Sequence, residues 1–137
     1  MTVALALAAN TARLVALRDF MDTGPGVARL RIYGNTRPAS TSTALGVAPL
    51  VELPLLKPCG TIDAGALTLA PGAAALNAGS GAAVWARLIN GAGDAVLDCD
   101  AGAVGNAAVE VWITGGGAAG AMLFEGGETT LVSAVFG

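Results

Sequence analysis

Residues 27–40 read VARLRIYGNTRPAS, and the first seven of them alternate in the way that is typical of a β-strand. Successive side chains of a strand point to opposite faces of its sheet. The alternation therefore predicts an apolar inner face and a mixed outer face: Ala28, Leu30 and Ile32 against Val27, Arg29, Arg31 and Tyr33. We interpret the two arginines as the solvated outer face of a strand, with a protein interface or a nucleic-acid contact as alternatives.

The same period of two recurs along the rest of the chain, after a single helical segment. Asn10 and Thr11 can cap a helix that runs to Asp22 and ends at Gly24-Pro25-Gly26. Short apolar stretches separated by Gly-rich and Pro-rich turns then indicate about eight strands, in 27–33, 49–56, 60–70, 83–90, 94–101, 107–114, 122–125 and 129–136. We predict an all-β fold, an antiparallel β-sandwich or jelly roll with one N-terminal helix, that forms a single domain over residues 10–137 after an arm of residues 1–9.

The composition is unusually apolar for one small domain. The chain has 137 residues, a net charge of -3 and a mean hydropathy of +0.66, and 12% of its residues are charged, against about 25% in ordinary soluble domains. Its apolar runs are too short to cross a bilayer, which takes roughly 20 residues, so we expect no membrane partner. We expect other chains to cover much of the surface instead.

Charge is unevenly distributed along the sequence. Residues 1–57 hold six basic and three acidic side chains, a net +3, whereas residues 58–137 hold one basic and seven acidic side chains, a net -6. Such a molecule can orient electrostatically against a partner. It has no basic stripe of the kind that phosphate backbones require, and we therefore expect no nucleic-acid partner.

The sequence offers little for catalysis. Histidine is absent, which excludes Ser-His-Asp and Cys-His nucleophile systems and the commonest transition-metal ligand. Acidic side chains could in principle form a catalytic pair or a calcium site, but we interpret all of them as solvated carboxylates: Asp94, Asp98, Asp100 and Glu110. Cys59 and Cys99 are predicted to be buried free thiols, and whether they meet is left open. We expect no enzyme activity, no metal and no cofactor.

Two tryptophans are the strongest candidates for a binding surface. Trp85 shares a strand phase with Arg87, and Trp112 shares one with Glu110 and Thr114, so both rings are predicted to project away from the core. They could anchor a protein interface, lie under the N-terminal helix, or stack on a sugar. The long loop 34–47 and the arm add further candidates. The predicted partner-binding residues are Val3, Leu5, Leu7, Arg37, Pro38, Trp85, Arg87 and Trp112.

Four segments resemble a known group of proteins. These are NTARLVALRDFMDTG (10–24), LRIYGNTRPAS (30–40), LVELPLLKPCGTIDAGALTLA (50–70) and AVWARLINGAGDAVLD (83–98). Together they resemble the cementing, or decoration, proteins of tailed-phage capsids, over roughly residues 10–114. The resemblance implies a jelly-roll virion protein, made in the cytoplasm of a host bacterium, that binds the outer capsid surface and clamps neighbouring major capsid proteins together.

The sequence leaves the oligomeric state and two rival functions open. We expect a homodimer, because two-fold contacts are the commonest closed symmetry. One rival function is that of a structural protein of the phage tail or baseplate. The other is a carbohydrate-binding adhesin that uses Trp85 and Trp112 as its platform.

Overall fold

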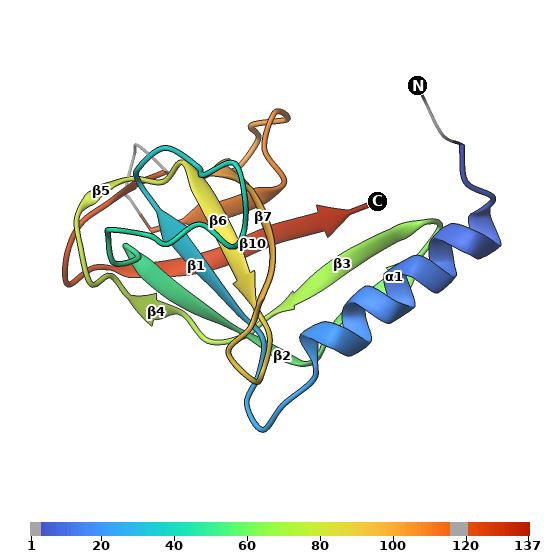
Figure 1. Cartoon of the computed structure of the whole chain (residues 1–137). Helices are drawn as coiled ribbons and strands as arrows, with labels where there is room; N and C mark the ends of the chain where they lie inside the picture. Colours follow the sequence, from blue (N-terminus) through green and yellow to red (C-terminus); the bar gives the residue numbers. More distant parts are fainter. Residues whose placement is uncertain (1–3, 116–120) are drawn as a thin grey trace.

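A computed structural model describes residues 4–115 and 121–137 and contains one helix and a set of mostly short strands (Figure 1). In chain order these are α1 (Leu7–Met21), β1 (Arg29–Tyr33), β2 (Val51–Asp63), β3 (Ala66–Pro71), β4 (Ala75–Leu76), β5 (Gly81–Ala82), β6 (Trp85–Ile89), β7 (Ala95–Ala103), β8 (Val111–Thr114), β9 (Met122–Leu123) and β10 (Glu128–Phe136). The predicted all-β class with an N-terminal helix is confirmed.

The main sheet closes on itself. Its strand order is β3-β2-β1-β6-β7-β8-β10-β4, and β10 also pairs with β3. The result is a barrel-like sheet, in keeping with the predicted sandwich or jelly-roll class. One pair departs from the predicted antiparallel arrangement: β7 and β8 run parallel, with Ala101 opposite Val111. The chain returns through residues 104–110 and so enters β8 in the direction in which it left β7.

The inner faces of the strands form one continuous core. The predicted inner face of β1 is confirmed, because Ala28, Leu30 and Ile32 are all fully buried. Their cross-strand neighbours are buried with them: Val51 and Leu53 on β2, and Ala86 and Leu88 on β6. The other side of the core comes from β3, β8 and β10, through Leu67, Leu69, Val111, Ile113, Leu131 and Ala134.

Helix α1 begins earlier than the sequence pattern suggested. Its N-cap is Ala6, which has no side-chain capping bond, so the prediction of a cap at Asn10 was wrong and residues 7–9 of the predicted arm are helical. The Leu-Ala-Ala run preceding Asn10 has a high helix propensity and extends the helix. Asn10 instead donates a hydrogen bond from Nδ2 to the Gly65 carbonyl, at 3.0 Å, between β2 and β3.

The helix packs on β2 and β3 (Figure 1). Leu14 and Met21, which lie two turns apart on one stripe, are fully buried there. At the C-terminal end of α1, the Asp22 carboxylate accepts the backbone N–H of Cys59 at 3.0 and 3.2 Å. From the middle of the helix Arg13 donates to the Gly137 carbonyl at 2.5 Å, so α1 is tied both to β2 and to the residue that follows β10.

Glycines allow the α1–β1 connection to touch the β6–β7 turn. The Gly91 N–H donates to the Met21 carbonyl at 3.2 Å, and the Gly26 N–H donates to the Gly91 carbonyl at 3.1 Å. A Cβ atom on Gly91 would lie 2.3 Å from the Gly26 carbonyl oxygen and 2.8 Å from that of Thr23. The backbones meet because Gly91 has no side chain.

This close approach yields a prediction about stability. Gly91→Ala should lower the free energy of unfolding by about 1–3 kcal/mol, the usual cost of forcing extra atoms into packed structure. Gly46→Ala is the matched control, because a Cβ there meets nothing within 4 Å; it should change stability by less than about 0.5 kcal/mol. Urea unfolding followed by circular dichroism measures both, and equal stability of the two variants would contradict the prediction.

Candidate binding surfaces

The outward side chains of β2, β1, β6 and β7 form a charged face. Strand register places Glu52, Arg31, Arg87 and Asp98 side by side in one row across these four strands. Glu52 accepts Arg31 Nε at 2.8 Å and Arg29 Nη1 at 2.7 Å. Arg29 and Arg31 therefore lie on an outer face, as predicted, and both are paired with the Glu52 carboxylate.

The ion pairs of the charged face shift the pKa values of Glu52 and Arg87. Burial works to raise the pKa of Glu52, but hydrogen bonds and positive charge from Arg31 and Arg29 outweigh it, so this pKa is lowered. The hydrogen bond that Arg87 donates to Asp98, reinforced by the charge of that carboxylate, raises the pKa of Arg87 against the opposing effect of burial. Each group is thus held in its charged form by its partner.

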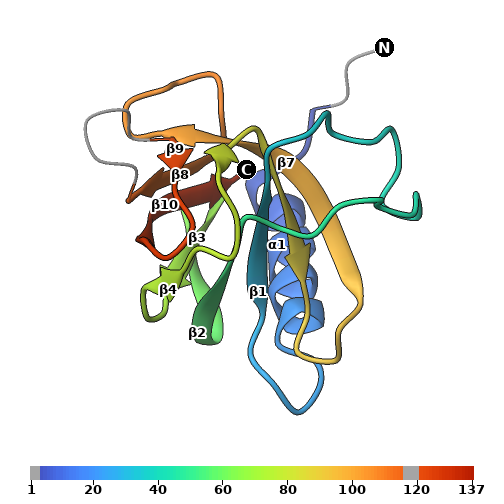
Figure 2. The ribbon, with the colours of Figure 1, turned by 90° about the vertical axis from the view of Figure 1, so that its left-hand side faces the viewer.

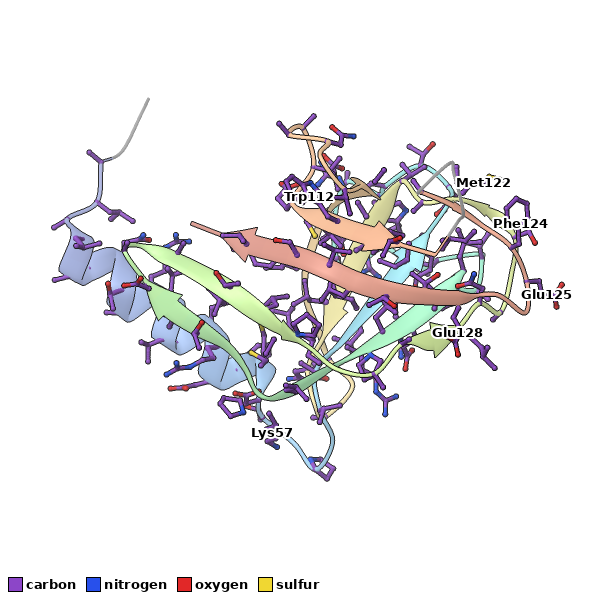
Figure 3. The ribbon with its side chains drawn as sticks, turned by 180° about the vertical axis from the view of Figure 1, so that it is seen from behind. Lys57, Trp112, Met122, Phe124, Glu125 and Glu128 are labelled. Atoms are coloured by element: carbon purple, nitrogen blue, oxygen red, sulfur yellow. The ribbon has the colours of Figure 1, made fainter. Side chains whose placement is uncertain are left out.

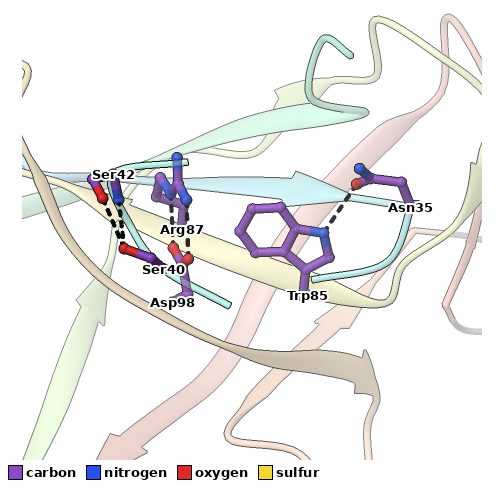
Figure 4. Close-up of polar contacts among 6 residues, drawn as sticks. All are labelled: Asn35, Ser40, Ser42, Trp85, Arg87 and Asp98. Carbon is purple, nitrogen blue, oxygen red and sulfur yellow. Dashed lines mark hydrogen bonds and ion pairs between the residues drawn. The ribbon is translucent and has the colours of Figure 1, made fainter. Parts of the chain in front are cut away.

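Trp85 and Arg87 lie on the predicted strand face, but both are buried. Trp85 is 0% exposed and stacks on Tyr33, with ring centroids 4.5 Å apart and an interplanar angle of 15°. Its indole N–H donates to Asn35 Oδ1 at 3.0 Å, and the Arg87 guanidinium lies 5.3 Å from its ring centroid (Figure 4). Trp85 therefore points away from the core, as predicted, but it does not reach the surface, because Tyr33 and its surroundings bury it.

Arg87 and Asp98 form the most buried ion pair of the charged face. Arg87 Nε and Nη2 donate to the two carboxylate oxygens of Asp98 at 2.7 and 3.0 Å, and both side chains are less than a tenth exposed (Figure 4). The interpretation of Asp98 as a solvated carboxylate was therefore wrong. Arg87 is likewise buried, at 7% exposure, and its role in partner binding stays a prediction.

The β1–β2 connection, which comprises residues 34–50, lies beside this face. Helix α1 does not lie over the charged face, because it packs on β2 and β3. The alternative prediction that the helix covers Trp85 is therefore also wrong. Figure 2 shows the connection in teal beside β7. Arg37 lies 3.6 Å from Asp100, exposed, and Pro38 is half-buried. An open groove of about 550 Å³ runs between the connection and β7, lined by residues 37–41 and 96–98.

A second outer face, over β8, β10, β3 and the end of β2, differs in character. Register and alternation place its outward residues in one uncharged field: Trp112 and Thr114 on β8, Thr130, Ser133 and Val135 on β10, Thr68 on β3 and Thr61 on β2. Val132 stands in a bulge of β10 and is also exposed. We call this set the uncharged face.

Trp112 is half-buried on the uncharged face, as its strand phase predicted (Figure 3). Its indole N–H donates to the Asn106 carbonyl at 2.8 Å. Beside it is a hollow of about 410 Å³, whose lining includes Val109, Glu110, Ser133 and Val135. Trp112 is therefore the one of the two tryptophans that reaches the surface, where its ring offers apolar area.

Three further candidates lie near the N-terminus. Leu5 and Leu7 are exposed, at the beginning of α1. Val3 lies outside the described residues. The role of all three in partner binding stays a prediction.

Leu76 and Phe124 are among the exposed apolar residues that the sequence interpretation did not single out. Phe124 had been placed in a strand over 122–125, but β9 ends at Leu123 and Phe124 begins a turn. The signal was present, because Phe124 stands directly before Glu125-Gly126-Gly127, a sequence typical of a turn.

The two cysteines are free and buried, as predicted. Burial, reinforced by the Asp22 carboxylate, raises the pKa of the Cys59 thiol to about 12. Burial, together with the negative charge of Glu110 and Asp100, raises the pKa of the Cys99 thiol to about 12. Within residues 4–115 and 121–137, no three potential metal-binding side chains from Cys, Asp and Glu come together.

None of the helical residues in the described ranges forms a span long and apolar enough to cross a membrane. Comparisons of the chain with protein-family models, with curated proteins and with solved structures each find no match.

The Arg87–Asp98 pair yields a prediction. Asp98→Ala leaves the Arg87 charge buried and unpaired, and should lower the free energy of unfolding by about 3–5 kcal/mol. The double variant Arg87→Leu/Asp98→Leu should recover most of this loss, because apolar replacements of a buried pair are often neutral. Glu52→Ala, which removes a half-exposed partner, should cost at most about 1 kcal/mol. If Asp98→Ala and Glu52→Ala are equally stable in urea unfolding, the pair is not structurally important.

The thiols yield another prediction. Since the thiolate is the reactive form and both thiols titrate near pH 12, Cys59 and Cys99 should resist iodoacetamide at pH 8 in the folded protein. Both should be alkylated at once in 6 M guanidinium chloride. Mass spectrometry counts the modified cysteines in each condition, and rapid alkylation of either one before unfolding would contradict the assigned burial.

Proposed function

We propose that the protein is a virion structural protein that binds the outside of a tailed-phage capsid and cements neighbouring major capsid proteins. The observation that carries the proposal is the uncharged face. Its named side chains are hydroxyls, valines and one indole, and the exposed carboxylates of Glu110 and Asp63 stand only at its edges, so covering its centre requires no ion to lose its hydration. Such a face suits a permanent contact with another protein.

The closed sheet supports the same function. A cementing protein must transmit load between the subunits that it joins, and β10 is held on both sides, by β8 and by β3. The four segments that resemble phage cementing proteins include α1 and the strands β1, β2, β3 and β6, which are all part of this barrel or pack directly on it. A homodimer on the capsid surface remains part of the proposal.

The adhesin alternative loses its two-ring platform. Trp85 is stacked on Tyr33 beneath the surface, so Trp112 would have to bind a sugar alone. No specific feature favours a tail or baseplate location over the capsid, and labelling of the protein on whole phage particles would separate the two. We therefore propose the capsid function over these two alternatives.

The proposal predicts that the protein binds and stabilises phage heads. Heads that lack it should lose their DNA at a lower temperature, and adding the purified protein should restore the original temperature. Gold-labelled protein should cover the whole head in electron micrographs. Label confined to the tail, or heads of unchanged heat stability, would contradict the proposal.

The role of the uncharged face can be tested separately. Val135→Glu places a charge within that face and should weaken binding to heads at least about 30-fold, the effect of losing an interface hot spot. Val47→Glu is the control, because Val47 is 49% exposed, close to the 42% of Val135, but belongs to the β1–β2 connection. Pelleting of heads with bound protein measures both affinities, after thermal melts show that both variants are folded. Equal binding by the two variants would exclude the uncharged face as the contact.

A further inference from the structure

One end of the barrel, formed by β4, β9 and the turn that leads into β10, presents large apolar side chains to solvent. Leu76 on β4 is 67% exposed, and Phe124 in the turn is 55% exposed. Figure 3 shows Phe124 at this end together with Glu125 and Glu128, away from α1 and Lys57. Leu76 pairs directly with Glu128 across β4 and β10, so their side chains are neighbours. We call these four residues the Phe124 tip: Leu76, Phe124, Glu125 and Glu128.

The backbone of the Phe124 tip is held by a buried polar residue. Asn77 is 3% exposed and its Nδ2 donates to the Phe124 carbonyl at 3.0 Å. The Asn77 N–H donates to the Gly127 carbonyl at 2.7 Å, and its own carbonyl accepts the Gly126 N–H at 3.0 Å. Its side-chain oxygen accepts the Thr129 hydroxyl at 2.5 Å.

A further contact fixes the middle of the turn. The Glu125 N–H donates to the Ser80 hydroxyl at 2.9 Å. Each residue of the turn, 124–127, thus makes a hydrogen bond to Asn77 or Ser80 in the segment that follows β4. An exposed aromatic ring on a turn held in this way loses little backbone freedom when a partner binds it, which favours affinity.

The charges around the tip have one sign. Glu125 and Glu128 flank the apolar pair, and the last basic residue in the sequence is Arg87, so residues 88–137 carry six acidic and no basic side chains. Both tip carboxylates are exposed, and neither is bound to an arginine or lysine of the chain in the described structure. The tip therefore presents an apolar centre with an acidic border.

We propose that the Phe124 tip inserts into an apolar pocket bordered by lysine or arginine side chains on a protein partner. A two-fold contact between two copies through the tip is disfavoured, because it would bring the carboxylates of both copies together. This inference rests on the proposed function, under which the partner that carries the basic-rimmed pocket is the major capsid protein. The tip then fixes the position of the protein on the capsid.

The test uses purified full-length protein and phage heads prepared without it. Phe124→Ser should weaken binding to these heads roughly 30-fold. Phe20→Ser is the matched control, because Phe20 is 45% exposed on α1 and should bind like the wild type. Glu125→Lys/Glu128→Lys should weaken binding and also remove part of its dependence on salt, because it removes the attraction to the basic border. Thermal melts verify that each variant is folded.

The possible outcomes separate this inference from the proposed function. If the wild type binds heads and Phe124→Ser binds equally well, the tip is not a contact and the capsid function stands. If Phe124→Ser weakens binding but the double lysine variant does not, the partner pocket is apolar without a basic border, and the inference as stated is wrong. If the wild type itself does not bind, the proposed function fails and the inference fails with it.

Discussion

The structure depends on the pairing of its last strand with β3. β10 forms antiparallel ladders with β8 through Thr130–Ala134 and with β3 through Val135 and Phe136. This pairing closes the main sheet, so the strands it joins have a distinct inside and outside. The same closure places the C-terminal Gly137 against Arg13 of α1. The closure of the sheet, on which the core and both outer faces depend, is therefore made by β10.

The inner and outer faces could be predicted from the sequence because they depend only on local alternation. Ala28, Leu30 and Ile32 are buried as expected, and Trp112 is on the outside as expected. The helix was also found, although its start was misplaced. The polar pair Asn10-Thr11 looked like a cap, and nothing local indicated that Asn10 would be drawn to Gly65, which is 55 residues away in sequence.

The burial of Trp85 and Arg87 could not be predicted from local alternation. Alternation assigns a residue to a face but does not reveal what lies over that face. Trp85 is buried by Tyr33, its neighbour across β1 and β6, and is held by Asn35 at the beginning of the β1–β2 connection. Asp98 was expected to be solvated for the same reason, since its partner Arg87 is on another strand. These contacts follow from strand register, which sequence alternation leaves undetermined.

A single strand links the two surfaces on which the functional proposals rest. The outward side chains of β10 run from Glu128, which belongs to the Phe124 tip, to Val135 on the uncharged face. A nine-residue strand spans about 25–30 Å, and β10 is paired along most of that length, so the two surfaces keep a fixed separation. Charge gives orientation and association rate, whereas burial of uncharged area gives lasting affinity. A protein with both on one rigid strand can be oriented by its acidic end and held by its uncharged face, which is the arrangement that the proposed clamp between capsid subunits would use.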